Sequence, residues 1–501
     1  MWLLAASCAT VVYLATMAPG VLWGDSGDAQ IRVLAGELGD PRDLARSHVT
    51  YYGAAIALHK LFRLEAALAA NLVSVLAGVI TVANFAWLVS MFVRRRLALV
   101  SGVALLLLSH TLWQLSTGAE VMTSSTLCLS FELAVLVRFA RTGRLRWLVL
   151  AGLANGIGWS THNLALLTWP AYVIVGWLRW SRVPVPRLRS IAAVIAAWLA
   201  GCAPLAVLFI IELRALDSFT VTLQSLLVGA YSRDVFNTAF GLGMLARDLA
   251  YILLNFPTPL ILLAPWGWWR LRKVGPGGVW WFLTLAALVI AAFAARYGVP
   301  DQYTFFVHAY LFLVLFAAIG VDQWLIRHPS KTMAVAVALL SFTAPVVYVA
   351  APPLARWYGE SRLPLPARRI PYRDPCAWFL RPWRTGYDGA ERYAREVFAA
   401  LPADAVLCAD STMRRPLDYL QIRDGIRPDV RLPGAPARRA GQTPLRISPE
   451  NTDEYVEQGL LFCTGNVEQY APSWLLDGGY HFEPSNLVYH VRPPPRPEGA
   501  P

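Results

Sequence analysis

Residues 66–96 read AALAANLVSVLAGVITVANFAWLVSMFVRRR, in which 28 uncharged residues are followed by three arginines. About 20 apolar residues in a helix are enough to cross the hydrocarbon core of a bilayer. Comparable apolar stretches recur as far as about residue 351 and then stop. The sequence therefore predicts a bundle of transmembrane helices followed by a tail of a different kind.

The composition of the chain is also that of a membrane protein. Of its 501 residues, 56% are hydrophobic and 15% are charged, whereas about a quarter of the residues of a soluble protein are charged. The net charge of +12 could suggest a nucleic-acid partner, but the cations form short clusters between the apolar stretches, as they do in cytoplasmic loops. We therefore predict a lipid bilayer and no nucleic acid as a partner. Nearly all the cations are arginine, which suggests a GC-rich bacterial genome.

We predict about eleven spans. If the N-terminus is cytoplasmic, every strong basic cluster of the membrane half falls in a cytoplasmic turn. Residues 1–20 lack the basic start of a signal peptide, so we expect an uncleaved first span rather than a leader. The predicted location is the bacterial cytoplasmic membrane, with the C-terminal domain outside the cytoplasm. The spans are 3–20, 66–93, 97–116, 121–140, 147–160, 163–178, 190–211, 246–268, 279–297, 304–324 and 333–351, and the basic clusters are 94–96, 138–146, 179–189, 270–273 and 327–331.

This orientation gathers polar residues from distant parts of the chain on the outer face. Trp23-Gly24-Asp25-Ser26-Gly27-Asp28 follows the first span, and two carboxylates at a membrane boundary are tolerated where water or a substrate reaches them. The plainer interpretation is a polar turn that ends a helix. The same face receives Glu120, residues 160–163, the 212–245 loop, Asp301-Gln302-Tyr303 and the tail. The layout suits a site at the bilayer surface, which a lipid-borne substrate enters sideways.

The tail has the pattern of a separate domain. We predict a transmembrane domain over 1–351, a linker without helical period over 352–387, an α/β domain over 388–492 and a disordered end over 493–501. The domain is expected to contain helices at 388–401 and 416–423 and strands at 405–408, 427–432, 460–463 and 487–491.

The six cysteines show no CxxC pair and no Cys/His spacing typical of a metal site. We predict no metal and no cofactor. The alternative is a divalent ion held by Asp25, Asp28 and substrate oxygens. A Cys408–Cys463 disulfide is conceivable if the tail lies outside the cytoplasm.

Four elements, in one order along the chain, resemble the protein O-mannosyltransferase-like membrane proteins. Residues 17–28, MAPGVLWGDSGD, resemble the opening motif of that family, and Gly118-Ala119-Glu120-Val121 resembles its Ala-Glu-Val-Tyr element. Residues 156–163, with Pro170, resemble its Gly-Leu…Asn-His…Pro element. The tail stretches 401–407, 417–421 and 427–431 are similar to the soluble extension of many bacterial members.

Two departures from the family pattern concern the first loop. The second acid is Asp28 where the family usually has Glu. The family's His-Pro-Pro-Gly-Tyr-Pro element is reduced to His48-Val49-Thr50-Tyr51-Tyr52-Gly53, without its prolines. The shape of this loop, the substrate and even the activity therefore stay open.

The resemblance implies a GT-C glycosyltransferase. Such enzymes are polytopic, take a sugar from a polyprenyl-phosphate carrier and hold an acidic residue in the first outer loop. The expected fold is a mainly α, GT-C-like transmembrane bundle with a small extracytoplasmic α/β domain. The expected partners are a polyprenyl-phosphate-linked sugar, with mannose as the candidate sugar, and a protein or glycan acceptor outside the cytoplasm.

Transfer to a hydroxyl needs a base for the acceptor proton and cations for the leaving phosphate. We predict Asp25 as the base and Asp28 as a second acid that orients Asp25 or touches the acceptor. The alternative for Asp28 is a helix N-cap or first-turn acid. The candidate phosphate ligands on the outer face are four arginines, each of which alone could instead be solvated or interfacial: Arg32, Arg46, Arg233 and Arg296.

Four further residues are candidate substrate contacts. His162 could bind phosphate or the sugar, or pack between helices. His48 could position the acceptor or the carrier, or lie exposed, and Glu120 could be a helix cap. Tyr303 could be a sugar platform or an interfacial aromatic.

Two other functions stay open at this point. One is a transporter or flippase of a lipid-linked glycan, although transporters usually carry polar groups near the midplane and inverted repeats. The other is a non-catalytic assembly protein of the cell envelope.

Overall fold

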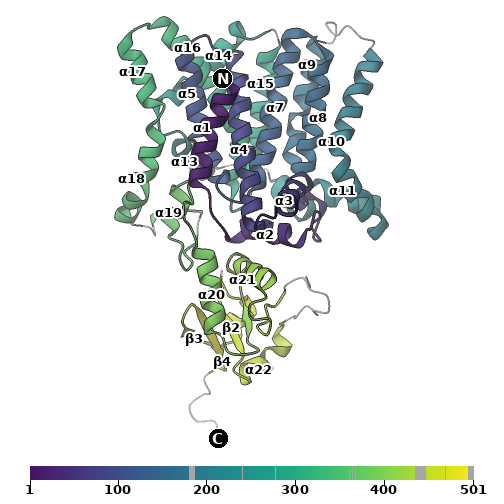
Figure 1. Ribbon diagram of the computed structural model, residues 1–501, viewed down its shortest axis with the longest axis vertical. Coiled ribbons are helices and arrows are strands. Elements are labelled where there is room, and N and C mark those ends of the chain that lie inside the picture. The colour runs from purple at the N-terminus through teal and green to yellow at the C-terminus, as the bar shows by residue number, and fades with distance from the viewer. Residues whose placement is uncertain are drawn as a thin grey trace.

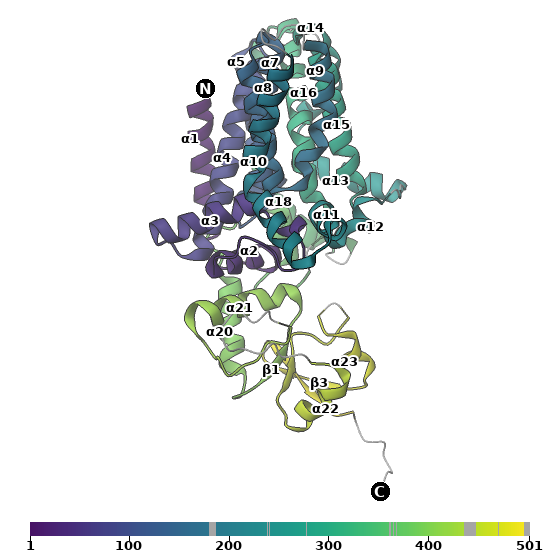
Figure 2. The same ribbon diagram turned by 90° about the vertical axis from the view of Figure 1, so that its right-hand side faces the viewer.

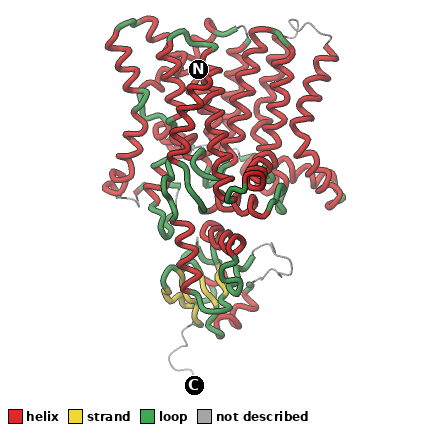
Figure 3. The backbone as a smooth tube through the Cα atoms, viewed as in Figure 1, coloured by secondary structure: helices red, strands yellow, loops and turns green. Residues whose placement is uncertain are grey.

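Long apolar helices run side by side in a bundle, and a smaller domain sits beyond one end of it (Figure 1; Figure 3). The computed structural model describes all residues except 180–186, 238, 240, 277, 360, 361, 364, 367, 435–446, 469 and 495–501. The N-terminus lies near the end of the bundle opposite the small domain (Figure 1). Most of the predicted disordered end, 493–501, and part of the basic cluster 179–189 lie outside the described residues.

A helix or a pair of helices lies at each stretch predicted as a span. Among the described residues, five helices are long and apolar enough to cross a membrane, or up to seven elements if each of two bent pairs is one span. The count of eleven therefore stays a prediction. The single helices are α1 (Trp2–Thr16), α4 (Ala66–Ser90), α5 (Arg96–Leu107), α7 (Val121–Thr142), α8 (Leu145–Thr161), α9 (Trp169–Arg179), α10 (Arg187–Leu216), α15 (Val279–Arg296) and α16 (Phe306–Arg327).

The two bent pairs break where the helical pattern is interrupted. Helix α13 (Leu242–Asn255) meets residues 259–274, which include α14 (Ala264–Val274), at an angle of 114° after Pro257. Helix α17 (Lys331–Leu340) meets α18 (Thr343–Tyr358) at 43°. Proline removes a backbone donor and restricts the residue before it, which explains the first break.

The core of the bundle is formed by α4, α7 and α16. In α4 and α7, 78% of the most apolar window is buried, against 17% in α10, so most side chains of α10 lie on the outside of the bundle. Helices α8 and α10 nevertheless pack closely at Gly156, where a Cβ atom would collide with the carbonyl oxygen of Trp198. Backbones approach this closely only where one residue is small.

Two shorter helices close the end of the bundle that faces the small domain. They are α2 (Gly24–Ala35) and α3 (Val49–Phe62), and they lie across the lower ends of the long helices (Figure 1; Figure 2). Both come from the predicted first outer loop.

The small domain has the predicted α/β character. Its sheet has the order β1-β2-β4-β3, with β1 and β2 parallel and Val406 opposite Leu461, and with β4 antiparallel to both neighbours. The helices pack beside this sheet. The elements are α20 (Gly389–Ala400), β1 (Val406–Cys408), α21 (Ser411–Asp424), α22 (Pro449–Glu457), β2 (Leu461–Cys463), α23 (Ser473–Asp477), β3 (His481–Ser485) and β4 (Val488–Arg492).

Three details of the tail differ from the sequence prediction. The strand predicted at 427–432 is a single bridge between Val406 and Arg431. Helix α21 begins five residues early because the Asp410 carboxylate accepts a hydrogen bond from the N–H group of Thr412. Strand β3 was not predicted, since its sequence HFEPS has no buried alternation.

The linker is partly helical. Helix α18 extends through Pro352 and Pro353 to Tyr358, and α19 spans Pro375–Leu380. The domain boundaries stay predictions. Cys408 and Cys463 are register neighbours across β1 and β2, but both are free thiols.

Candidate functional site

A cavity of about 1350 Å³ lies between the end of the bundle and the small domain. Residues from α2, the first loop, the start of α7, the end of α8, the 300 loop, the linker and α21 line it. Eight of the ten predicted site residues are among them: Asp25, Asp28, Arg32, Arg46, His48, Glu120, His162 and Tyr303.

Hydrogen bonds hold the segment before α2 in place and thereby fix the position of Asp25. The side-chain amide of Gln30 accepts a hydrogen bond from the N–H group of Leu22 and donates to the carbonyl of Gly20. Asn71 of α4 donates to the carbonyls of Ala18 and Gly20. The segment before Asp25 is thereby tied to the core of the bundle.

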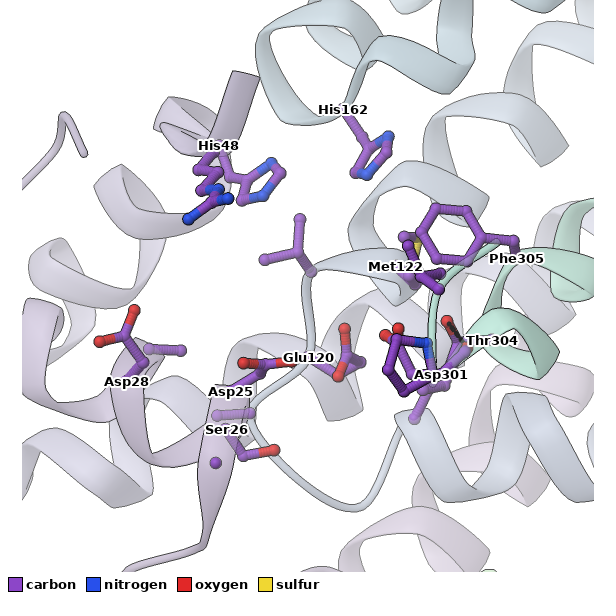
Figure 4. Close-up of a pocket in the computed structure, with 18 of the residues that line it drawn as sticks. Asp25, Ser26, Asp28, His48, Glu120, Met122, His162, Asp301, Thr304 and Phe305 are labelled. Atoms are coloured by element: carbon purple, nitrogen blue, oxygen red, sulfur yellow. Dashed lines mark hydrogen bonds between the residues drawn. The ribbon is translucent and has the colours of Figure 1, made fainter. Parts of the chain in front are cut away.

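Asp25 itself is accessible from the cavity, and within the described residues its carboxylate has no hydrogen bond and no ion pair. Figure 4 shows it on the same side of the cavity as Glu120 and Asp301. A carboxylate held in place by its backbone but unpaired is available to a substrate.

The three carboxyl groups influence one another. Enclosure by the protein, and then the charge of Asp28, raises the pKa of Asp25. Enclosure, and then Asp25 and Asp301, raises the pKa of Glu120 to about 8. Enclosure and Asp25 raise the pKa of Asp301 to about 6. Burial and like charges both disfavour the ionised form, so the cluster retains protons at a pH where exposed carboxyl groups have lost them.

Asp28 has a different environment from Asp25. Its Oδ1 lies 3.0 Å from Nη2 of Arg415 in α21, and its Oδ2 lies 3.4 Å from Nη2 of Arg42 in the first loop. It is neither the N-cap, which is Trp23, nor in the first turn of α2. The capping alternative for Asp28 is therefore wrong, and its carboxylate joins the first loop to the tail.

Close packing explains why the motif has a glycine at position 27. A Cβ atom at Gly27 would lie 2.6 Å from the carbonyl oxygen of Leu22 and 2.7 Å from Cβ of Arg415. Contacts this short do not occur between real side chains, so only glycine lets α21 approach α2 here.

Arg32, predicted as a phosphate ligand, is fully buried and organises the first loop. It donates to the carbonyls of Leu38, Arg46 and Ser47 and pairs with Asp40. Its guanidinium also stacks 3.7 Å from the ring centre of Tyr52. Within the described part of the chain, Nε is the one nitrogen of this guanidinium without a hydrogen-bond partner.

Two predicted arginines do not reach the cavity. Arg233 is exposed in the short helix α12 (Ser232–Val235). Arg296 is exposed at the end of α15 and donates to the carbonyl of Ala292 in its own helix. Neither side chain is among the residues that line the cavity.

Of the three cations that act on Asp25, the sequence predicts Arg46 as a site residue but not Arg42 or Arg415. Arg42 and Arg415 bracket Asp28, and the charges of Arg415, Arg42 and Arg46 all act to lower the pKa of Asp25. Further arginines from the linker line the cavity, namely Arg368, Arg373 and Arg384. Arg42 could have been found by its place in the first loop, but the tail arginines carry no signal until the tail is docked.

Two stacked imidazoles line the cavity. The ring centroids of His48 and His162 are 5.2 Å apart, and the angle between the ring planes is 10°. Enclosure lowers the pKa of His48 to about 4 and lowers that of His162 well below its usual range. Both rings are therefore neutral at ordinary pH. Tyr303 packs edge-on against Phe379 of α19.

Within the part of the chain that the structure describes, no group of three or more His, Cys, Asp or Glu side chains is arranged to hold a metal ion. A divalent ion between Asp25 and Asp28 stays a hypothesis. The Asp28 carboxylate already pairs with two arginines, so a divalent ion would compete with them for its oxygens.

No protein-family model and no curated protein matches the chain. Among solved structures, it is similar to ArnT from Cupriavidus metallidurans bound to undecaprenyl phosphate, with 14% identity and a TM-score of 0.56 over 98% of this chain and 97% of that one. The apo state of ArnT gives 15% identity and a TM-score of 0.55 over the same shares. The chain has the GT-C fold.

The fold expected from the sequence is thus confirmed, and the protein is a multi-pass membrane protein. The oligosaccharyltransferase of Archaeoglobus fulgidus, in complex with Zn and sulfate, is similar over 83% of this chain and 61% of that one, at 10% identity and a TM-score of 0.44.

Proposed function

We propose that this GT-C protein is a membrane glycosyltransferase that moves a sugar from a polyprenyl-phosphate carrier to a hydroxyl acceptor outside the cytoplasm. One observation carries the proposal: an unpaired carboxylate, Asp25, faces the cavity beside the cations Arg42, Arg46 and Arg415. The similarity of the whole chain to ArnT bound to undecaprenyl phosphate supports a lipid-phosphate donor.

The proposed reaction is a single displacement, with inversion as the expected outcome. The acceptor oxygen forms a bond to the anomeric carbon, the bond from that carbon to the phosphate oxygen breaks, and the phosphate leaves on the lipid. Asp25 takes the acceptor proton. Its raised pKa makes it a stronger base than an exposed aspartate.

Arginines suit the leaving phosphate because a guanidinium fork binds two phosphate oxygens. Arg46 is a candidate because it lines the cavity and Asp43 is its one ion-pair partner among the described residues, with Nε of Arg46 3.4 Å from Oδ2 of Asp43. Its guanidinium stacks 4.5 Å from the ring centre of Tyr231. Arg42 and Arg415 already pair with acids and would share their donors with the phosphate.

The apolar part of the cavity wall suits the first isoprene units of a carrier. Leu164 and Leu167 of η2 (Asn163–Thr168), Phe293 of α15, and Val299 contribute to it. These elements belong to the bundle, so a lipid would enter from the membrane. The small domain covers the opposite side with Thr412 and Arg415.

The test is incubation of the purified protein with undecaprenyl-phosphate mannose, glucose and galactose, followed by detection of released undecaprenyl phosphate. Mannose is the sugar that the sequence resemblance suggests. Asp25→Asn should reduce transfer at least 10³-fold, as expected for loss of a base together with its charge. Asp477→Asn, an exposed carboxylate of α23, is the matched control and should be fully active. Full activity of Asp25→Asn would remove Asp25 from this role.

A further inference from the structure

The two stacked imidazoles lie across the cavity from the carboxylates. Figure 4 shows His48 and His162 on one side and Asp25, Glu120 and Asp301 on the other. The catalytic proposal uses the acids and the cations but gives the histidines no role.

Hydrogen bonds to the backbone fix which ring nitrogen of each histidine carries the proton. Nδ1 of His48 lies 2.8 Å from the carbonyl oxygen of Thr161, which can only accept, so this Nδ1 is the donor. Nδ1 of His162 accepts from the N–H group of Leu164 at 3.2 Å. In neutral rings, Nε2 of His48 therefore carries a lone pair, and Nε2 of His162 carries a hydrogen.

Both Nε2 atoms are unused. Neither has a hydrogen-bond partner among the described residues, and both rings line the cavity. The pair thus presents one acceptor and one donor, side by side, to whatever fills the space.

The first loop holds His48 in an unfavourable backbone conformation. Its φ and ψ are both 44°, in the left-handed region that residues other than glycine rarely adopt. Arg32 secures the two residues before it by bonding the carbonyls of Arg46 and Ser47. Strained residues persist where the surroundings over-determine them, and such residues concentrate at functional sites.

We propose that His48 and His162 recognise hydroxyl groups of the donor sugar. This inference rests on the proposed function. Nε2 of His48 accepts a hydrogen bond from one hydroxyl, and Nε2 of His162 donates to the same or a neighbouring one. A sugar without the matching hydroxyl would leave these nitrogens without a hydrogen bond, which lowers its affinity. The pair therefore determines sugar specificity.

The tautomers argue against the phosphate as the ligand of this pair. An ionised phosphate presents only acceptor oxygens, and the lone pair of His48 would face them without a hydrogen between. A hydroxyl is both donor and acceptor, so it satisfies either imidazole. The phosphate is better served by the arginines near Asp25 and Asp28.

Substitution by asparagine tests the cavity-facing Nε2 of each histidine separately from the backbone hydrogen bond that its Nδ1 makes. An Asn side chain places an amide group near the position of Nδ1, so His48→Asn can still donate to Thr161 and His162→Asn can still accept from Leu164. Neither variant has a group at the position of Nε2. Asn also tolerates the left-handed conformation needed at position 48. Glutamine reaches the position of Nε2 and serves as the rescue variant.

The experiment measures binding of two lipids to the purified full-length protein. The probes are undecaprenyl phosphate and whichever of undecaprenyl-phosphate mannose, glucose or galactose the wild type binds most tightly. His48→Asn and His162→Asn should each weaken binding of the sugar-bearing lipid about three- to tenfold, as for loss of one neutral hydrogen bond. Binding of undecaprenyl phosphate should be unchanged, which also shows that the variants are folded. His48→Gln and His162→Gln should recover part of the loss.

Two outcomes would overturn this inference but not the proposed function. One is an equal loss of affinity for both lipids, and the other is unchanged affinity for both lipids in the double Asn variant. If the wild type binds neither lipid, the proposed function fails and this inference fails with it. The measurement needs no turnover, so a failure of catalysis does not obscure a failure of sugar recognition.

Discussion

Nη2 of Arg415 in the small domain lies 3.0 Å from Oδ1 of Asp28 in the first loop. Only about a sixth of each side chain is exposed, so water screens the pair weakly. Together with the close contact of Gly27 and Arg415, this pair docks α21 on α2 and closes one side of the cavity. The tail is therefore part of the site.

Removal of this pair should loosen the tail. Arg415→Ala leaves Asp28 with Arg42 as its one remaining ion-pair partner among the described residues, and we expect a loss of about 1–3 kcal/mol of stability. The measurement is the thermal unfolding midpoint, combined with hydrogen exchange of the amides of α21. Arg492→Ala, which removes an exposed pair with Glu483 in the same domain, is the control and should change little. Equal effects of the two variants would contradict a docking role for Arg415.

The same two residues should move the pH profile of transfer in opposite directions. Asp28 raises the pKa of Asp25 and Arg415 lowers it. A base works in its ionised form, so kcat/KM should fall as the pH drops through the pKa of Asp25. Asp28→Asn should shift this acid limb to lower pH and Arg415→Ala should shift it to higher pH. Shifts in the same direction would show that the limb reports another group.

Glu120 should make the protein less stable as the pH rises. Its pKa is about 8 in the folded protein and its ordinary value is 4.5, so the folded state binds the proton more tightly than the unfolded chain. Between about pH 4.5 and 8 the unfolded state loses this proton first, and this group's contribution to stability falls with increasing pH. Glu120→Gln removes that contribution, so its unfolding midpoint should fall less than that of the wild type from pH 5 to 8. Glu454→Gln, an exposed carboxylate of α22, should follow the wild type.

The sequence predicts those features that depend on local pattern or on topology. Apolar length locates the helices, and the alternation of inside and outside turns brings Asp25, Glu120, His48 and His162 to one end of the bundle before any contact is known. Arg415 escapes prediction because its role exists only after the tail docks on α2, a contact between residues nearly 400 positions apart. Likewise, the sign of a charge at 233 or 296 does not reveal the direction in which its helix points it.

Arg32 shows that residue type alone leaves the role of an arginine open. It was predicted to bind phosphate, yet its guanidinium bonds three carbonyls of the first loop and pairs with Asp40. The loop lacks the prolines of the family that it resembles, and Arg32 supplies an alternative means of fixing its shape. A rigid fork is needed for this, because several donors must point to carbonyls at fixed places.

Arg32→Lys should therefore act as a structural change with a specific effect on the sugar. An ammonium group cannot reach all the partners of the guanidinium, so we expect a loss of about 2–4 kcal/mol of stability. Because the carbonyls of Arg46 and Ser47 are released, His48 should relax from its left-handed conformation, and affinity for the sugar-bearing lipid should fall more than affinity for undecaprenyl phosphate. Arg233→Lys, at an exposed arginine that does not line the cavity, should leave both the unfolding midpoint and the two affinities unchanged. If Arg32→Lys instead selectively lowered the affinity for undecaprenyl phosphate, the guanidinium would be a phosphate ligand.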